Sequence, residues 1–88
     1  MKIYLSGLQV VLKRFEKTGN YEKCGHWSIA KGGYDLWWEL YWNNYTVLQC
    51  IAGELVGGFK PIPEFTEEIE LKIIKRVQEF YPELKIKK

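Results

Sequence analysis

The sequence predicts an α+β fold in which a three-stranded antiparallel β-meander carries a C-terminal helix, and an N-terminal helix, on one face. The two helices are predicted by two observations: an apolar stripe at helical spacing near the start of the sequence, and a second one near its end. A third predicts the meander, since three aromatic and β-branched runs are separated by residue pairs suited to tight turns. With 88 residues, 47% of them apolar, the chain is expected to form a single compact domain over residues 1–88.

The first element, within residues 3–17, is predicted to be a helix. Ser6 and Gln9 have the spacing of a capping box, and Gly19 is typical of a helix stop. A strand is the alternative, because apolar residues around Val10 also alternate. The helical stripe, which spans about 120°, contains Tyr4, Leu5, Leu8, Val11, Leu12 and Phe15.

The middle of the chain is predicted to form three strands over residues 24–31, 34–42 and 45–52. Two-residue turns are expected at the glycine pair and at the asparagine pair between them, because such residues tolerate positive φ. An additional edge strand beyond the meander is left open. The residues expected in the two turns are Gly32, Gly33, Asn43 and Asn44.

Two-residue turns would fix the register of the whole meander. On the helix-covered face the expected cross-strand pairs are Trp27 with Trp38, Ile29 with Leu36, Trp42 with Tyr45, Leu40 with Val47 and Leu36 with Ile51. The opposite face would then hold Cys24, His26, Ser28, Ala30, Asp35, Trp37, Glu39, Tyr41, Thr46, Leu48 and Cys50.

The last element, Glu67–Phe80, is predicted to be a helix because its apolar residues lie within about 140° of one face. Thr66 is the expected N-cap and Pro82 the expected stop. The glutamates of the first turn suit the positive end of the helix dipole. Residues 53–65 are expected to form a connector, and residues 83–88 are expected to fray.

Composition excludes several classes of protein. No run of about 18 apolar residues is present, so we expect no membrane-spanning helix. Residues 1–11 lack the pattern of a secretory signal, and two cysteines are too few for a disulfide scaffold. A cytoplasmic protein is therefore expected. The net charge of +2 is too small to indicate a strongly basic arm.

The chemistry-bearing residues are sparse. Cys24, His26 and Cys50 are the only soft metal ligands, and their spacing does not predict a structural zinc site. The triad-like set of Cys24, His26 and Glu39 is the only arrangement that would suit nucleophilic catalysis. No glycine-rich phosphate loop is present. We therefore expect no metal, no cofactor and no enzymatic activity. A Cys/His enzyme is the third hypothesis, after the two binding functions described below.

The predicted function is that of a small binding protein. Trp37, Tyr41 and Leu48, with a polar rim of His26 and Glu39, form an aromatic sheet face typical of a protein-binding surface. A stoichiometric inhibitor or adaptor, of the kind that phages and mobile elements encode, is one form of this function. A second copy of the chain is an alternative cover for the same face.

Direct nucleic-acid binding is the alternative function. Basic side chains on the exposed sides of the two helices would contact phosphates. Trp37 and Tyr41 would stack on bases, although Asp35, Glu39 and Glu54 lie around them. The basic residues in question are Lys13, Arg14, Lys17, Lys72, Lys75 and Arg76.

Overall fold

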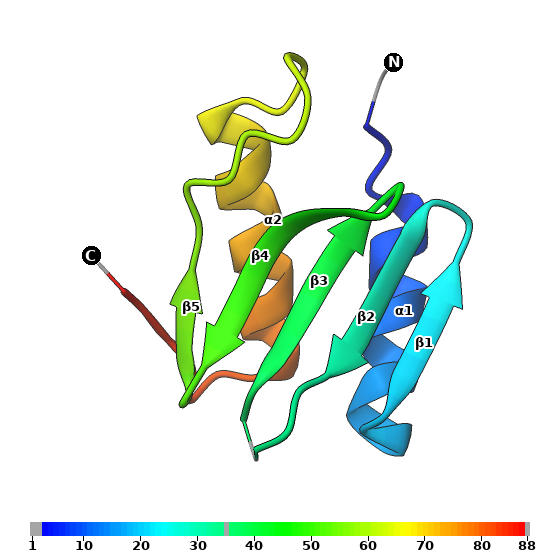
Figure 1. Cartoon of the computed structure of the whole chain (residues 1–88), viewed down its shortest axis with the longest axis vertical. Coiled ribbons are helices and arrows are strands. Elements are labelled where there is room, and N and C mark those ends of the chain that lie inside the picture. The colour runs from blue at the N-terminus through cyan, green and yellow to red at the C-terminus, as the bar shows by residue number, and fades with distance from the viewer. Residues whose placement is uncertain (1–2, 35, 88) are drawn as a thin grey trace.

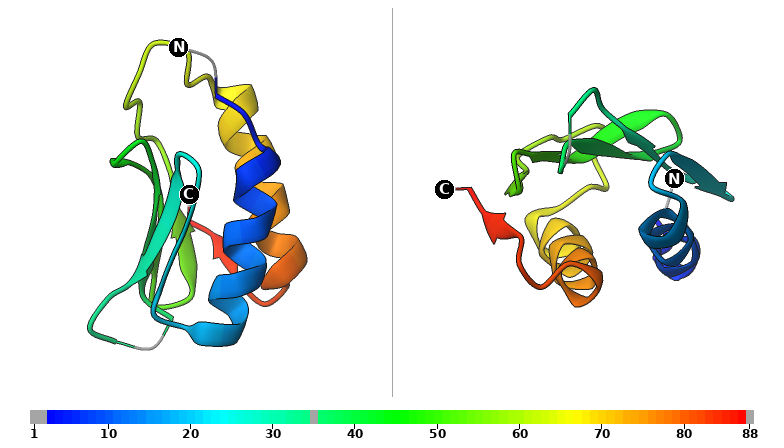
Figure 2. Two further views of the ribbon diagram at one scale, coloured as in Figure 1. Left: turned by 90° about the vertical axis from the view of Figure 1, so that its right-hand side faces the viewer. Right: turned by 90° about the horizontal axis from the view of Figure 1, so that it is seen from below.

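The computed structural model describes residues 3–34 and 36–87. The fold is α+β, as predicted, with a mostly antiparallel six-stranded sheet and two helices on one of its faces (Figures 1 and 2). The elements are α1 (Ser6–Thr18), β1 (Tyr21–Cys24), β2 (Trp27–Lys31), β3 (Trp38–Trp42), β4 (Tyr45–Ile51), β5 (Glu54–Val56), α2 (Glu67–Phe80) and β6 (Lys85–Ile86).

The order of the strands in the sheet follows their order in the chain. The first four pairings are antiparallel, and β6 pairs parallel to β5 after the α2 crossover. The predicted two-residue turn at Asn43 and Asn44 is confirmed, because Trp42 pairs with Tyr45. Both asparagines have positive φ, as the tight hairpin turns require.

The N-terminal segment forms helix α1, which confirms the helical prediction over the strand alternative. The helix ends at Gly19, where φ is 70° and the amide donates to the Phe15 carbonyl at 2.8 Å. The predicted capping box is wrong, because Leu5 occupies the N-cap position and Ser6 is already helical. Tyr4 precedes the helix and is exposed, so its place on the apolar stripe was also wrong.

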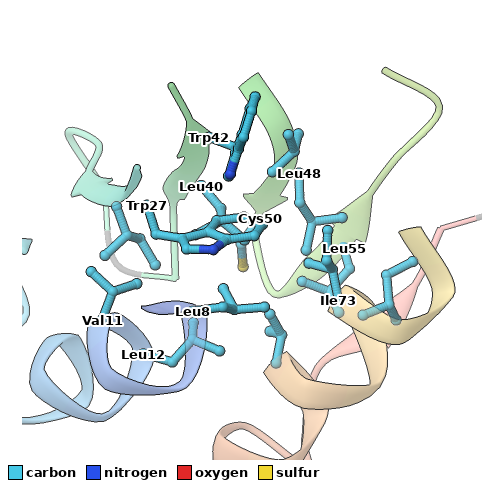
Figure 3. Packing of buried hydrophobic residues seen from close by; sticks show 14 of the residues in the cluster. Leu8, Val11, Leu12, Trp27, Leu40, Trp42, Leu48, Cys50, Leu55 and Ile73 are labelled. Carbon is cyan, nitrogen blue, oxygen red and sulfur yellow. The ribbon is translucent and has the colours of Figure 1, made fainter. Parts of the chain in front are cut away.

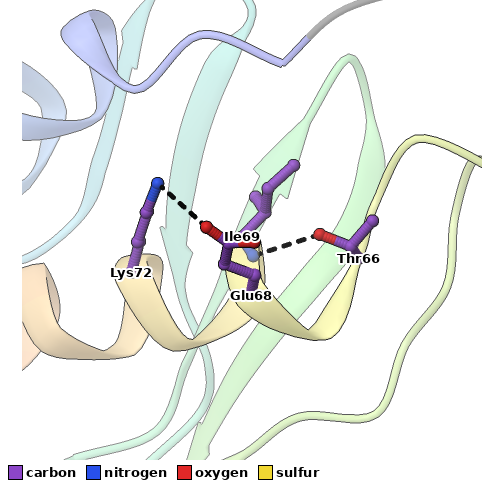
Figure 4. A network of polar contacts seen from close by, with 4 residues as sticks. All are labelled: Thr66, Glu68, Ile69 and Lys72. Atoms are coloured by element: carbon purple, nitrogen blue, oxygen red, sulfur yellow. Dashed lines mark hydrogen bonds and ion pairs between the residues drawn. The ribbon is translucent and has the colours of Figure 1, made fainter.

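Helix α2 has the predicted bounds and the predicted N-cap. The Thr66 hydroxyl accepts a hydrogen bond from the Ile69 amide at 3.3 Å (Figure 4). One turn further, Lys72 lies 3.6 Å from Glu68 in an exposed ion pair, the other contact drawn in Figure 4. These contacts stabilise the first turns of α2 from within the helix itself.

The core lies between the sheet and the two helices (Figure 3). Leu8 and Leu12 of α1 and Ile73 of α2 are fully buried there. They pack with sheet residues that include Trp27 and Leu55. Burial of each such side chain stabilises the fold by about 1.5–3 kcal/mol.

The β2–β3 connection is longer than predicted. Trp27 pairs with Trp42 and Lys31 pairs with Trp38, so the two strands are separated by six residues, 32–37, in place of a two-residue turn. Leu36 lies in this loop, outside any strand, and its predicted pairings are wrong. The shift is an even number of residues, so it preserves which face each side chain occupies. The three tryptophans predicted inside, Trp27, Trp38 and Trp42, are therefore buried on the helix side as expected.

A β-bulge changes the face assignment in β4. Tyr41 pairs with Thr46, but Leu40 pairs with Leu48, which leaves Val47 as the extra residue. Beyond Val47 the alternation of β4 is reversed. Leu48 and Cys50, both predicted on the uncovered face, are instead fully buried in the core (Figure 3). The single inserted residue is the physical reason for both errors.

The sheet extends beyond the meander at both edges. β1 pairs with β2 through a turn at Gly25 and His26, so Cys24 faces the helices together with Trp27. β5 occupies part of the predicted connector, and its Leu55 is fully buried.

The chain after α2 returns to the sheet. The amides of Lys85 and Lys87 donate to the carbonyls of Gly53 and Leu55, at 3.3 and 2.9 Å. Leu84, just before them, is only 3% exposed. The expectation that residues 83–88 fray is therefore wrong for Leu84 and for β6, and Lys88 lies outside the described residues.

Candidate functional site

The five side chains predicted to form one binding surface lie in different places. Glu39 and Tyr41 do share the uncovered face, because they alternate with the buried residues of β3. Leu48 is in the core. Trp37 belongs to the β2–β3 loop and His26 to the β1–β2 turn, at opposite ends of the sheet (Figure 1). The structure therefore does not assemble the predicted aromatic sheet face.

The triad-like set is not assembled either. Cys24 faces the helices beside Trp27, whereas Glu39 lies on the opposite face. His26 is exposed in its turn, with its ring centroid 5.5 Å from that of Trp42. Cys24 and His26 line a hollow of about 290 Å³ near the start of α1, and Glu39 does not reach it.

The described part of the chain offers no metal site. Within residues 3–34 and 36–87, no group of three or more His, Cys, Asp or Glu side chains is placed to hold an ion. In the same residues, neither helix has the length and apolar character needed to cross a membrane.

The β2–β3 loop, residues 32–37, presents large apolar side chains to solvent. Tyr34 is 71% exposed and Leu36 is 48% exposed. The ring of Tyr34 packs against that of Trp37, with centroids 5.6 Å apart. The Trp37 indole in turn covers Gly32, where an added Cβ would lie 2.6 Å from its Cδ1 atom. Within the described part of the loop, Trp37 therefore contacts both Tyr34 and Gly32.

The carbonyl of Leu36 anchors this loop to the end of the sheet. It accepts a hydrogen bond from the Gly53 amide at 3.2 Å and one from the Cys50 thiol at 3.1 Å. Leu36 has a φ of 54°, which costs a non-glycine residue about 1–2 kcal/mol. The two hydrogen bonds at its carbonyl help to offset that cost. Buried surroundings raise the pKa of the Cys50 thiol, so the thiol remains a donor at neutral pH.

Aromatic side chains form the floor beneath the loop. Trp38 contacts Phe15 of α1 and Tyr81 after α2, with ring centroids 6.1 and 6.2 Å away. These residues, with Leu36, Trp37, Gly19 and Lys31, line a hollow of about 180 Å³. Burial, and secondarily Glu16 and Glu83, raises the pKa of Tyr81, which stays a neutral phenol.

The uncovered face of the sheet is mostly polar at its centre. The Tyr41 hydroxyl donates to Glu39 Oε2 at 3.2 Å, and the Thr46 hydroxyl donates to the same oxygen at 3.4 Å. Burial first, and Glu39 second, raises the pKa of Tyr41. The residues on this face are Tyr21, Lys23, Ser28, Ala30, Glu39, Tyr41, Thr46, Gln49, Ile51, Glu54 and Val56.

The six basic residues predicted to contact nucleic acid all lie in the helix layer. Two of them have partners there: Lys72 pairs with Glu68, and Arg76 donates to Gln9 Oε1 at 2.9 Å, which ties α2 to α1. The other four, Lys13, Arg14, Lys17 and Lys75, are exposed.

The sequence placed Tyr34 and Leu36 in a strand and did not predict their exposed positions between β2 and β3. The aromatic residues after the glycine pair are typical of a strand. Asp35 is the one residue among them that disfavours a strand, since aspartate is depleted in strands. Asp35 itself, predicted on the uncovered face, lies outside the described residues.

The comparisons with known proteins give no relative. No family model matches the chain, and neither a curated protein nor a solved structure matches it.

Proposed function

We propose that this chain is a small non-enzymatic protein-binding domain that acts stoichiometrically, as an inhibitor or adaptor, through its β2–β3 loop. One observation carries the proposal. Tyr34 and Leu36 are held in solvent, beside Trp37, by a loop whose strained backbone is fixed to the sheet. Backbone strain persists only where the surrounding structure imposes it, and it concentrates at functional sites.

The residue types and the anchoring both favour protein recognition. Tyr and Trp dominate the energetics of protein interfaces, where they fill pockets on the partner. A loop already fixed by the Leu36 carbonyl loses little conformational entropy when it binds. The hollow beside it offers a place for an apolar side chain of the partner.

Site-specific photo-crosslinking tests this proposal. Tyr34 is replaced by p-benzoylphenylalanine, and the variant is irradiated in an extract of the source cells. Tyr45 is the matched control, because it is also a tyrosine, is 51% exposed and begins β4 at the opposite end of the sheet. We expect a discrete protein adduct from position 34 that excess unmodified chain abolishes, and no such adduct from position 45.

Two results would contradict the proposal. One is an equally strong adduct at position 45, and the other is no competed adduct at position 34. Nuclease treatment of the extract adds a further arm. An adduct that disappears with nuclease indicates indirect capture through nucleic acid and removes direct protein binding by the loop.

Direct nucleic-acid binding is the second candidate. The observation in its favour is that α1 and α2 lie side by side, so their basic residues share one layer (Figure 2). Counter-evidence comes from α2, which also carries Glu67, Glu68, Glu70 and Glu79. Binding through the basic residues would weaken steeply as salt concentration rises.

A further inference from the structure

Glu39 occupies an unusual position for a carboxylate. It lies on the uncovered sheet face near the start of β3, one of the two central strands, and it is half-buried. Its cross-strand neighbours in the register are Ala30 and Gln49, which carry no charge. Within residues 3–34 and 36–87, the structure places no Lys or Arg at ion-pair distance from it. Glutamate is depleted in strands, and neither of the residues directly opposite supplies an opposite charge.

The carboxylate is held in a fixed orientation. Both hydroxyl donors, from Tyr41 and Thr46, reach the same oxygen, Oε2. Among residues 3–34 and 36–87, no hydrogen bond reaches the other oxygen, Oε1, which can accept one from a partner. Ala30, directly opposite on β2, has only a methyl side chain. The chain thus presents an oriented negative charge beside an aromatic ring.

We propose that the uncovered face docks an arginine side chain of a protein partner, with Glu39 and Tyr41 as its recognition pair. Charge complementarity supports this occupant, because the half-buried carboxylate has no Lys or Arg at ion-pair distance among the described residues, and a cation from the partner would pair with it. A guanidinium is planar, so it can stack on the Tyr41 ring while it donates to Oε1. An ammonium group makes only a point contact. Glu39 is the second residue of β3, so this surface begins close to the β2–β3 loop, but it is formed by the sheet face and the proposal does not depend on the loop.

The test uses the purified full chain and a small probe. The ¹⁵N-labelled protein is titrated with N-acetyl-arginine amide, and amide shifts are followed by NMR. N-acetyl-citrulline amide is the matched control, because it has nearly the same shape without the charge. We expect saturable shifts at Glu39, Thr46 and Gln49 with the arginine probe, and no saturable shifts with the citrulline probe.

A pair of variants assigns the effect to one carboxylate. Glu39→Gln keeps an acceptor for the two hydroxyls, so the fold is retained, and it should raise the Kd of the arginine probe about fivefold or more. Glu54→Gln removes a charge from the same face at β5 and should leave that Kd unchanged. N-acetyl-lysine amide should bind at least about twofold more weakly than the arginine probe.

Several outcomes would overturn the proposal. These are saturable binding of citrulline, unchanged affinity in Glu39→Gln, equal losses in both variants, or lysine binding as tightly as arginine. Shifts confined to the first turn of α2 would indicate a general attraction to its glutamates and would also overturn it. None of these outcomes bears on the loop, so the two proposals fail separately.

Discussion

Individual residues decide how the β2–β3 loop is held. The Leu36 carbonyl receives two donors, and one of them, the Cys50 thiol, is buried and reached the core only because of the bulge at Val47. An inserted residue in β4 therefore determines the conformation of a loop between two other strands. Sequence reasoning predicted neither, because neither Gly nor Pro marks the bulge. Glu39 and Tyr41 were placed correctly because β3 alternates regularly.

Replacement of Cys50 by alanine should weaken this anchor. We expect Cys50→Ala to lower the free energy of unfolding by about 1–2 kcal/mol, since a hydrogen bond and some packing are lost. The raised thiol pKa adds a pH signature. A group with a raised folded pKa contributes stability below its unfolded pKa, and that stability is lost as pH rises through the folded pKa. Wild-type stability should therefore fall above about pH 9, and less so in Cys50→Ala.

Urea unfolding between pH 7 and pH 10 measures both effects, with Cys24→Ala as the control. Cys24 is only half-buried and ends β1 at the opposite end of β2 from the β2–β3 loop, so its replacement should cost less and leave the alkaline loss intact. Identical behaviour of the two variants would show that Cys50 does not hold the loop.

The helices and strands differ in how far their sequences determine them. Both helices follow from apolar periodicity, and the bounds of α2 follow from Thr66 and the residues around Pro82. The faces of β2 and β3 were predicted correctly despite a wrong turn length, because the loop differs from a two-residue turn by an even number of residues. In β4 the bulge adds one residue, and every face assignment after Val47 is reversed.

A pair of cap variants tests the helix termini. Thr66→Ala should lower the free energy of unfolding by about 1 kcal/mol, because the Ile69 amide loses its acceptor. Ser6→Ala should change it by less than about 0.5 kcal/mol, since Ser6 is helical and does not occupy the N-cap position. Thermal or urea unfolding measures both values. A larger loss in Ser6→Ala than in Thr66→Ala would restore the capping box that the sequence predicts.

At the scale of the whole molecule, β6 completes the sheet, and the sequence did not predict this strand. Four antiparallel pairings join strands that are adjacent in the chain, but β6 joins β5 only after the complete α2 crossover. Its two residues are too few for a periodic pattern to predict them. The burial of Leu84 shows that this segment belongs to the core as well as to the sheet.

Substitutions in this closing segment should separate packing from pairing. Leu84→Ala should lower the free energy of unfolding by about 2–4 kcal/mol, because a buried leucine leaves a cavity. Ile86→Ala, at a side chain 45% exposed, should cost less than about 1 kcal/mol. Both are measured by urea unfolding of the full chain. Comparable small losses in both variants would contradict this prediction and would support the fraying expected from the sequence.

The attachment of Tyr4 to β2 has a practical consequence. The Trp27 indole donates to the Tyr4 carbonyl at 2.7 Å, which fixes residues near the N-terminus to the top of β2. Figure 1 places this segment and the β2–β3 loop at opposite ends of the molecule. A tether attached ahead of Ile3 would therefore immobilise the protein with Tyr34 and Leu36 directed away from the support, leaving them open to an incoming macromolecule.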